Sequence, residues 1–459
     1  MNIRPGWCGA VLVLVLASAV DAKSPPPPSL PKAPAPAASA VVAAPDLAAS
    51  APPVSLSARK VYEQASSQLV QIRTLLKGRS SQTSVGSGFF VSAQGHIITN
   101  FHVVSELALQ PERHDLVYVT TDGREAPVQL LMVDVLHDLA LLKVVDGPDH
   151  PPYDALLFRT STQPLGQGER MYSMGIPLDV GFAVIEGNYN GLVERSFYPQ
   201  IFFAGALSAG MSGGPALDQE GRVIGVNVAR RVDGEVSFLV PAEFASALLA
   251  RGRDAPPLKL PAWPVVAEQL MAHQAVLTDR FIRQGWKTGT HPRYTVPVPA
   301  DRFMRCWGTS EHSTSGGLDF ERADCVMDTR VFVGPFTTGT LATRHESYDG
   351  RKLGTLRFAA RYAQSFRNEP FQRLAGNVQT KAQCRDDFLE RGGLPLRAVV
   401  CLRAYKKLPK LYDVSVLVAT LDQPQSGVLG RFDVQGVAFE NAMKLSRHYL
   451  EAYGWVPSH

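Results

Sequence analysis

Short apolar runs separated by turn signals dominate the chain from residue 70 to about residue 250. One pair of runs lies in GSGFFVSAQGHIITN, on either side of an Ala-Gln-Gly turn. A second pair alternates apolar and polar positions in LVYVTTDGREAPVQLLMV and breaks at Asp122-Gly123, which is a strong hairpin signal. A third pair, in ALDQEGRVIGVNV, turns at Gln-Glu-Gly. Many short strands with few helical periods predict an all-β barrel or sandwich.

The pattern changes after a proline-rich linker at residues 254–261. Residues 264–284 repeat apolar positions at helical spacing, and residues 414–418 form a strand-like run. The chain closes with a helix-like run whose apolar side chains are expected near one face: Phe439, Met443, Leu450 and Tyr453. We therefore predict a β-rich domain over residues 55–252 and a C-terminal α+β domain over residues 261–459.

The first residues have the pattern of an export signal. Arg4 and the terminal amine precede an apolar run from Val11 to Leu16, and small residues then offer cleavage sites. Because the run is too short to cross a bilayer, residues 1–22 are predicted to be a secretory signal peptide, with an uncleaved anchor as the alternative. Residues 23–54 are rich in proline and alanine and predict an extended linker. The expected location is periplasmic or extracellular, with no transmembrane segment beyond the signal peptide.

Charge and cysteine usage narrow the class of protein. The chain has 46 Lys+Arg against 42 Asp+Glu without a basic cluster, which excludes a nucleic-acid-binding footprint. Four cysteines lie beyond the signal peptide: Cys306, Cys325, Cys384 and Cys401. In an exported chain they indicate two disulfides, and of the three possible connectivities the local one, Cys306 with Cys325 and Cys384 with Cys401, closes the shortest loops. A zinc site is the alternative, but no CxxC pair is present, and we predict no metal or organic cofactor.

One serine stands on a bare turn, Ser212 in GMSGGP. A hydroxyl becomes a strong nucleophile only when a base takes its proton. Upstream, IITNFHVVSE places His102 after a predicted buried strand, and LMVDVLHDLALLKV places Asp138 at the start of an apolar run. These are the residue types of a Ser–His–Asp triad. The backbone amides of Gly210 and Ser212 could form an oxyanion hole beside it.

Other residues compete for the roles of base and acid. His96 follows a turn glycine, and His137 is expected on the opposite side of a strand from Asp138. Asp134 lies four residues before Asp138, but only Asp138 directly abuts the apolar run.

The segment Gly210-Met-Ser-Gly-Gly214 also fits the G-x-S-x-G nucleophile elbow of α/β-hydrolases. Those enzymes place the serine before the acid and the histidine, on a chain that alternates strands and helices. Here the order is His102, Asp138, Ser212 on a β-rich chain, which is the order of the chymotrypsin-like class.

Five motifs in sequence order resemble the trypsin-like protease domain of the bacterial HtrA/Deg family: GSGFFVSAQGHIITNFHVVSE, HDLALLKV, MYSMGIPLD, GMSGGPALDQEGRVIGVNVA and SFLVPAEF. The resemblance spans roughly residues 70–249. It implies two perpendicular β-barrels with the site between them, His102 as general base, Asp138 as orienting acid and Ser212 as nucleophile. Gly210 and Ser212 match the family's oxyanion-hole positions.

The chain departs from the family pattern at two places. Met211 stands where the family usually has asparagine, and no PDZ-like carboxylate-binding loop pattern follows residue 261. In chymotrypsin-like enzymes the residue six positions before the nucleophile lies at the base of the primary specificity pocket. Here that residue is Ala206, which disfavours Lys or Arg before the scissile bond and favours an apolar or small side chain.

The sequence therefore predicts a mainly β chain, with a chymotrypsin-like double β-barrel protease domain followed by an α+β domain. The predicted function is that of an exported serine endopeptidase that cleaves proteins or peptides through an acyl-enzyme. Two alternatives stay open. One is a catalytically latent or inactive scaffold whose C-terminal domain serves binding, and the other is an esterase that uses the same triad. The sequence leaves the oligomeric state open.

Overall fold

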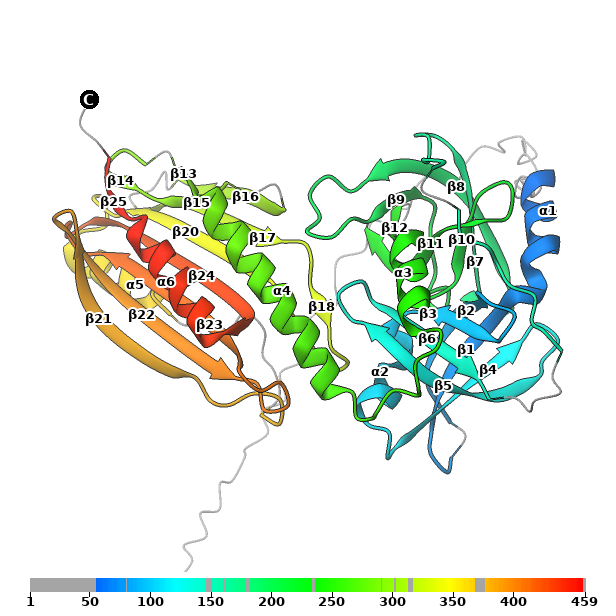
Figure 1. The fold of residues 1–459 in the computed structure, drawn as a ribbon. Coiled ribbons are helices and arrows are strands. Elements are labelled where there is room, and N and C mark those ends of the chain that lie inside the picture. The colour runs from blue at the N-terminus through cyan, green and yellow to red at the C-terminus, as the bar shows by residue number, and fades with distance from the viewer. Residues whose placement is uncertain are drawn as a thin grey trace, which may run out of the picture. The chain divides into compact units, whose positions relative to one another are not determined.

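A computed structural model of the chain describes residues 55–79, 81–145, 151–159, 162–177, 181–232, 236–289, 291–300, 303–312, 317–367 and 376–456 (Figure 1). The predicted signal peptide, residues 1–22, and the predicted linker, residues 23–54, lie outside the described residues. The described residues from Ser55 to Val456 belong to one compact unit.

The first barrel follows helix α1 (Leu56–Ala65), which Ser55 caps by accepting a hydrogen bond from the Ala58 amide. Six antiparallel strands close in the order β1-β2-β3-β6-β5-β4. Their bounds are β1 (Leu69–Leu76), β2 (Ser81–Phe90), β3 (His96–Thr99), β4 (His114–Thr120), β5 (Glu125–Asp134) and β6 (Leu139–Val144). One short helix, α2 (Phe101–Leu109), connects β3 to β4 and packs apolar side chains into the barrel.

The second barrel closes in the order β10-β11-β12-β9-β8-β7. Its strands are β7 (Arg170–Gly175), β8 (Ala183–Leu192), β9 (Ile201–Ala204), β10 (Pro215–Leu217), β11 (Val223–Val232) and β12 (Val236–Pro241), and α3 (Ala242–Gly252) follows. Two closed barrels of six strands confirm the predicted double-barrel fold.

The C-terminal region is built on a seven-stranded antiparallel sheet in the order β16-β17-β20-β24-β23-β22-β21. The strands are β16 (Met304–Glu311), β17 (Asp319–Met327), β20 (Leu341–Asp349), β21 (Gln383–Arg391), β22 (Leu394–Ala404), β23 (Leu411–Thr420) and β24 (Ser426–Ala438). Helices α4 (Trp263–Gln284) and α6 (Phe439–Glu451) lie on one face of the sheet (Figure 1). Helix α5 (Thr355–Ser365) packs against a separate apolar cluster that includes Tyr348 and Leu429.

Short strands complete the C-terminal region. They are β13 (Trp286–Thr288), β14 (Tyr294–Thr295), β15 (Pro297–Pro299), β18 (Val331–Phe332), β19 (Thr337–Thr338) and β25 (Gly454–Trp455). They form the two-stranded pairs β13–β15, β14–β25 and β18–β19. The β18–β19 pair lies beside His102.

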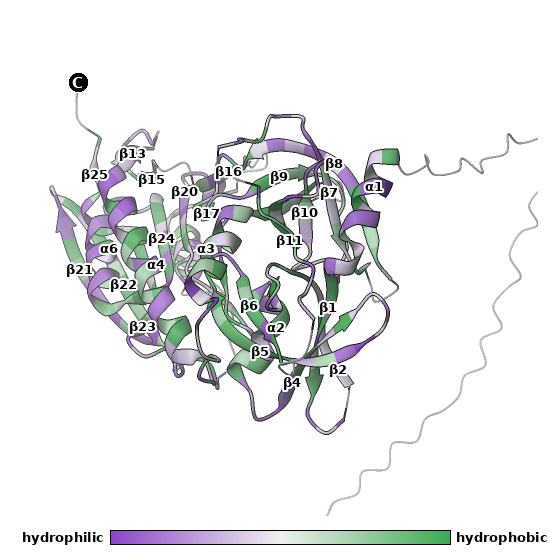
Figure 2. Cartoon of the chain, turned by 45° about the vertical axis from the view of Figure 1, so that its right-hand side comes forward, coloured by the Kyte–Doolittle hydropathy of each residue, from purple (hydrophilic) through white to green (hydrophobic). Residues whose placement is uncertain are grey.

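The predicted apolar face of the last helix is partly wrong. The side chains that α6 buries are Ala442, Leu445, Ser446 and Tyr449, whereas Phe439 is 53% exposed. The buried set has the i, i+3, i+4, i+7 spacing of a helix that docks on a sheet. Phe439 is the first residue of α6 and packs edge-on against Tyr412 instead. Figure 2 shows hydrophilic positions along α4 and α6 and hydrophobic positions along the strands of the sheet.

The four cysteines form two disulfides, Cys306–Cys325 and Cys384–Cys401, each with a Cα–Cα distance of 4.0 Å. Each pair joins directly opposite residues of neighbouring strands, β16 with β17 and β21 with β22. Because β16 and β21 are the two outer strands of the seven-stranded sheet, each disulfide ties an edge strand to its inner neighbour.

The start of α4 is bound to the first barrel. The Leu258 amide donates to the Leu130 carbonyl at 2.7 Å, and the Gln269 side chain accepts from the Val135 amide and donates to the Val133 carbonyl, both at 2.8 Å. Apolar residues of α4, such as Leu270, share a core cluster with residues of the barrel and of α2. These contacts fix α4 beside the end of β5, which leads into Asp138.

Candidate active site

His102 and Asp138 form a hydrogen-bonded pair on the first barrel. His102 is the second residue of α2, and Asp138 ends the turn between β5 and β6. The imidazole Nδ1 lies 2.6 Å from Asp138 Oδ2, and the His102 backbone amide donates to Asp138 Oδ1 at 2.8 Å. One carboxylate therefore holds both the side chain and the backbone of the histidine, which fixes the orientation of the ring.

The backbone of Asp138, which makes both contacts to His102, is held in an unusual conformation. Its φ of 55° lies in the left-handed region, which costs a non-glycine residue about 1 kcal/mol. The Asp138 carbonyl accepts hydrogen bonds from the Phe101 amide at 3.1 Å and from Asn100 Nδ2 at 2.8 Å. Strain of this kind persists where neighbouring contacts over-determine the conformation, and it is concentrated at functional sites.

Ser212 comes from the second barrel, on the turn between β9 and β10, and is 6% exposed. Its carbonyl accepts a hydrogen bond from the Ser87 amide of β2 at 2.7 Å. The next residue, Gly213, has a φ of +85°, and a Cβ there would lie 2.9 Å from the Asn100 backbone nitrogen. The turn that carries Ser212 is therefore packed against the segment that leads into His102, so residues of both barrels meet at this site.

Side chains of the two barrels orient the peptide groups before Ser212. The Gly210 carbonyl accepts from the Ser87 hydroxyl at 2.7 Å, and the Met211 carbonyl accepts from Asn227 Nδ2 at 3.3 Å. Gly210 has a φ of +91°, which glycine adopts without strain. Within the described part of the chain, the Gly210 amide donates to no acceptor.

Met211 is an apolar anchor for the same turn. Its side chain is fully buried in the second barrel, in a cluster with Leu207, Ile224 and Leu239. Gly175 lies directly against it, since a Cβ on Gly175 would be 2.8 Å from Met211 Cα. The HtrA/Deg family, which this chain resembles, usually has a polar asparagine at this position. Here the apolar side chain of Met211 holds the serine turn by close packing.

His96, the alternative base, is a satisfied core histidine. Its Nδ1 lies 2.6 Å from the Ser92 hydroxyl, and its Nε2 lies 2.9 Å from the Arg253 carbonyl. Burial is the main cause that lowers the pKa of His96, which keeps the ring neutral near pH 7.

His137 and Asp134 form a second histidine–aspartate pair. The prediction that His137 lies on a strand is wrong, because residues 135–138 form a turn in which His137 Nδ1 lies 2.9 Å from Asp134 Oδ2. Burial alone would raise the pKa of Asp134, but the hydrogen bond and charge of His137 outweigh it and lower that pKa. The His137 ring stacks on Phe244 of α3, with ring centroids 3.8 Å apart. One face of the His137 ring is therefore used in packing.

A contact that sequence reasoning missed continues from His137 into the C-terminal region. The Tyr198 ring lies edge-on to His137, and the Tyr198 hydroxyl lies 2.8 Å from His273 Nδ1 on α4. Burial raises the pKa of Tyr198 and lowers the pKa of His273, so both groups are neutral near pH 7. No local sequence signal joins these three residues, because they lie on separate elements.

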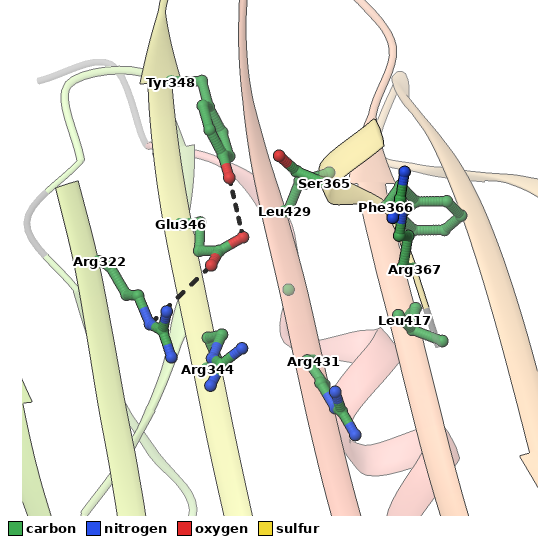
Figure 3. A pocket seen from close by; sticks show the side chains of 11 residues that line it. Arg322, Arg344, Glu346, Tyr348, Ser365, Phe366, Arg367, Leu417, Leu429 and Arg431 are labelled. Carbon is green, nitrogen blue, oxygen red and sulfur yellow. Dashed lines mark hydrogen bonds and ion pairs between the residues drawn. The ribbon is translucent and has the colours of Figure 1, made fainter. Parts of the chain in front are cut away.

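A separate hollow on the C-terminal sheet has a volume of about 190 Å³ (Figure 3). Arg322, Arg344 and Arg431 enter it from β17, β20 and β24. Asp324 pairs with Arg322 at 2.5 Å and with Arg344 at 2.7 Å, and Arg431 pairs with Asp433. Arg322 also lies 3.9 Å from Glu346, so three carboxylates balance the three arginine charges within the sheet.

Among the described residues, no group of three or more His, Cys, Asp or Glu side chains could hold a metal ion. In the same part of the chain, no helix is both long and apolar enough to cross a membrane.

Part of the chain is similar to known serine proteases. The family model described as "Trypsin-like peptidase domain" matches residues 86–226. A "Probable periplasmic serine endoprotease DegP-like" of Hahella chejuensis is 32% identical over 187 residues, which are 39% of this chain and 37% of that protein. "Serine protease HTRA3" of Homo sapiens is 30% identical over 207 residues, which are 42% of this chain and 44% of that protein. In both comparisons the matched part covers less than half of the relative's length.

Among solved structures, the serine endoprotease from Yersinia pestis matches 43% of this chain and 67% of its own, with 21% identity and a TM-score of 0.37. The two closed barrels agree with the match of residues 86–226 to a trypsin-like peptidase domain. In this part of its length the chain is similar to DegP-like and HtrA serine proteases.

Proposed function

We propose that the chain is an exported serine endopeptidase with His102, Asp138 and Ser212 as its catalytic triad. The observation that carries the proposal is the pair of contacts from Asp138 to His102, at 2.6 Å to the ring and 2.8 Å to the backbone amide. With Asp138 ionised, the ring proton lies on Nδ1, and Nε2 is left with a lone pair to accept the Ser212 proton.

The reaction that this arrangement supports has two halves. Ser212 Oγ attacks the peptide carbonyl carbon while its proton passes to His102 Nε2, and the oxyanion is stabilised by the amides of Gly210 and Ser212. His102 then gives the proton to the leaving amine nitrogen, which departs and leaves an acyl-enzyme. In the second half, water attacks the acyl carbon and loses a proton to His102. The bond to Ser212 Oγ then breaks, Oγ takes that proton back from His102, and the carboxylate product leaves.

We expect cleavage after small or apolar residues. Ala206 is half-buried and offers no carboxylate to a basic side chain. Its neighbour Leu207 is fully buried, with its amide donating to the Ser237 hydroxyl at 3.0 Å. The ring of Phe203 fills the space beside Gly205, where a Cβ would lie 2.4 Å from it. Apolar groups therefore dominate this part of the second barrel.

The proposal of export is supported by the two disulfides, which persist in oxidising compartments. The DegP-like relatives are named periplasmic, which agrees with it.

Hydrolysis of an unfolded protein tests the proposal. Wild-type mature protein is expected to cut denatured casein into peptides that mass spectrometry assigns to cleavage after small or apolar residues. Ser212→Ala is expected to reduce the rate at least about 10⁴-fold, because the nucleophile is lost. A folded wild type that cuts no peptide bond would favour the inactive scaffold, and Ser212-dependent hydrolysis of p-nitrophenyl esters alone would favour the esterase.

A further inference from the structure

A hairpin of the C-terminal region packs against the helix that carries His102. Strands β18 and β19 pair Val331 with Thr338 and Phe332 with Thr337, and the Val333 amide donates to the Phe336 carbonyl at 2.9 Å to close the turn. In the sequence, this hairpin lies about 230 residues after His102.

The hairpin is anchored on both sides of Phe332. Val331 and Val333 are fully buried in the core cluster of the first barrel, together with Val104 and Leu109 of α2. At the turn, a Cβ on Gly334 would lie 2.8 Å from Leu109 Cδ1, so the hairpin backbone rests directly on α2. Phe332 lies between the two valines and packs at the margin of the same cluster, where it is only partly buried.

The Phe332 side chain lies against the catalytic histidine. Its ring is edge-on to the His102 imidazole, with centroids 6.0 Å apart and an interplanar angle of 80°, and it is edge-on to Phe101 at 6.5 Å. Phe332 is only partly buried, and the His102 side chain keeps 29% of its surface exposed. Two neighbouring rings, of which one is the imidazole, are therefore both partly open to solvent.

The hairpin is also tied to the seven-stranded sheet. Phe336 stacks on Tyr405, with ring centroids 5.4 Å apart, and the Thr338 hydroxyl lies 2.8 Å from the Tyr405 hydroxyl. Phe332 is thus held at the site by a barrel on one side and by the C-terminal domain on the other. A side chain fixed in this way offers a preorganised surface to a ligand.

We propose that Phe332 is a specificity-determining residue of the protease site, and that it selects an aliphatic or aromatic substrate side chain beside His102. The proposal rests on the proposed function. A partly exposed phenyl ring beside His102 offers contact area to an apolar side chain, whereas a charged side chain would lose water there without a partner. The C-terminal domain would then form part of the active site itself.

Peptide profiling of four full-length proteins tests this proposal: wild type, Phe332→Ala, Phe332→Leu and Phe388→Ala. The probes are internally quenched peptides that share one cleaved bond and carry leucine or aspartate at each flanking position in turn. Wild type is expected to prefer leucine over aspartate about 10-fold or more in kcat/KM at one position on the acyl side of the bond. Phe332→Ala is expected to lose that preference at this position alone, and Phe332→Leu to retain most of it.

Phe388 supplies the matched control, since it is a phenylalanine of the same domain that is 71% exposed on an edge strand. Its replacement by alanine is expected to leave every preference unchanged. An equal loss of rate for all peptides in Phe332→Ala would assign the ring a purely structural role and overturn the proposal, as would unchanged preferences. If wild type shows no Ser212-dependent hydrolysis of any peptide, the proposed function itself fails, and this inference fails with it.

Discussion

Replacing Asp138 with asparagine is expected to lower kcat/KM about 10⁴-fold while the protein stays folded. In the wild type, both carboxylate oxygens of Asp138 accept hydrogen bonds, one from His102 Nδ1 and one from the His102 amide. An asparagine has only one acceptor oxygen. If its oxygen faces the backbone amide, its NH₂ group faces Nδ1 and forces the ring proton onto Nε2. That nitrogen must accept the proton of Ser212, so the wrong tautomer stops the general-base step.

The chain provides its own control for this experiment. Asp134 and His137 form a similar pair, at 2.9 Å, that packs against Phe244 instead of the serine turn. Asp134→Asn is expected to change kcat/KM by less than about threefold, with its effect confined to stability. Steady-state kinetics on a quenched peptide and thermal unfolding of both variants provide the comparison. Equal losses of activity in the two variants would contradict the assignment of Asp138 as the acid.

Replacing Gly213 with alanine is expected to destabilise the protein by at least about 4 kcal/mol or to inactivate it through a displaced serine turn. A Cβ at this position would lie 2.3 Å from the Ser87 carbonyl oxygen and 2.4 Å from Thr99 Oγ1. Those two atoms are themselves joined by a hydrogen bond of 2.7 Å. The added methyl group therefore cannot be accommodated without separating β2 from the end of β3, and this moves Ser212 relative to His102.

Gly221→Ala separates the steric effect from backbone strain. Gly221 also has a positive φ, +77°, but the nearest atom to an added methyl group there would be Gln64 Oε1, at 3.9 Å. Only the left-handed conformation then costs free energy, about 1–2 kcal/mol. Urea unfolding and peptide hydrolysis of both variants are the measurements. A Gly213→Ala protein as stable and active as Gly221→Ala would show that the serine turn is not packed as described.

Local patterns were sufficient to predict short paired strands, whereas the choice of two barrels over a sandwich followed from the family resemblance. Strand pairs such as β4 and β5 are joined by an Asp122-Gly123 turn whose conformation depends on the residues themselves. The same holds for the serine turn, where positive φ angles at Gly210 and Gly213 require glycine. The assignment of catalytic roles to His102, Asp138 and Ser212 stays a prediction until it is tested.

Contacts between distant elements could not be predicted in this way. Nothing in the residues around Phe332 indicates that they pack on α2, because that contact depends on the position of the whole C-terminal domain. The prediction of the buried face of α6 was partly wrong, because that face also depends on how the helix docks on the sheet. Phe439 is apolar, but it is the first residue of the helix, directly after β24, and it stays 53% exposed with an edge-on contact to Tyr412 of β23.

The central claim is that His102, Asp138 and Ser212 form a working triad, and a fluorophosphonate probe tests it most directly. Such a probe reacts with a serine that is activated by a base and supported by an oxyanion hole, and it requires no knowledge of the substrate. Intact-mass analysis of labelled wild-type mature protein is expected to show a single adduct that is absent from Ser212→Ala and from His102→Ala. A folded wild type that forms no adduct would contradict the claim, and so would an adduct that persists in Ser212→Ala.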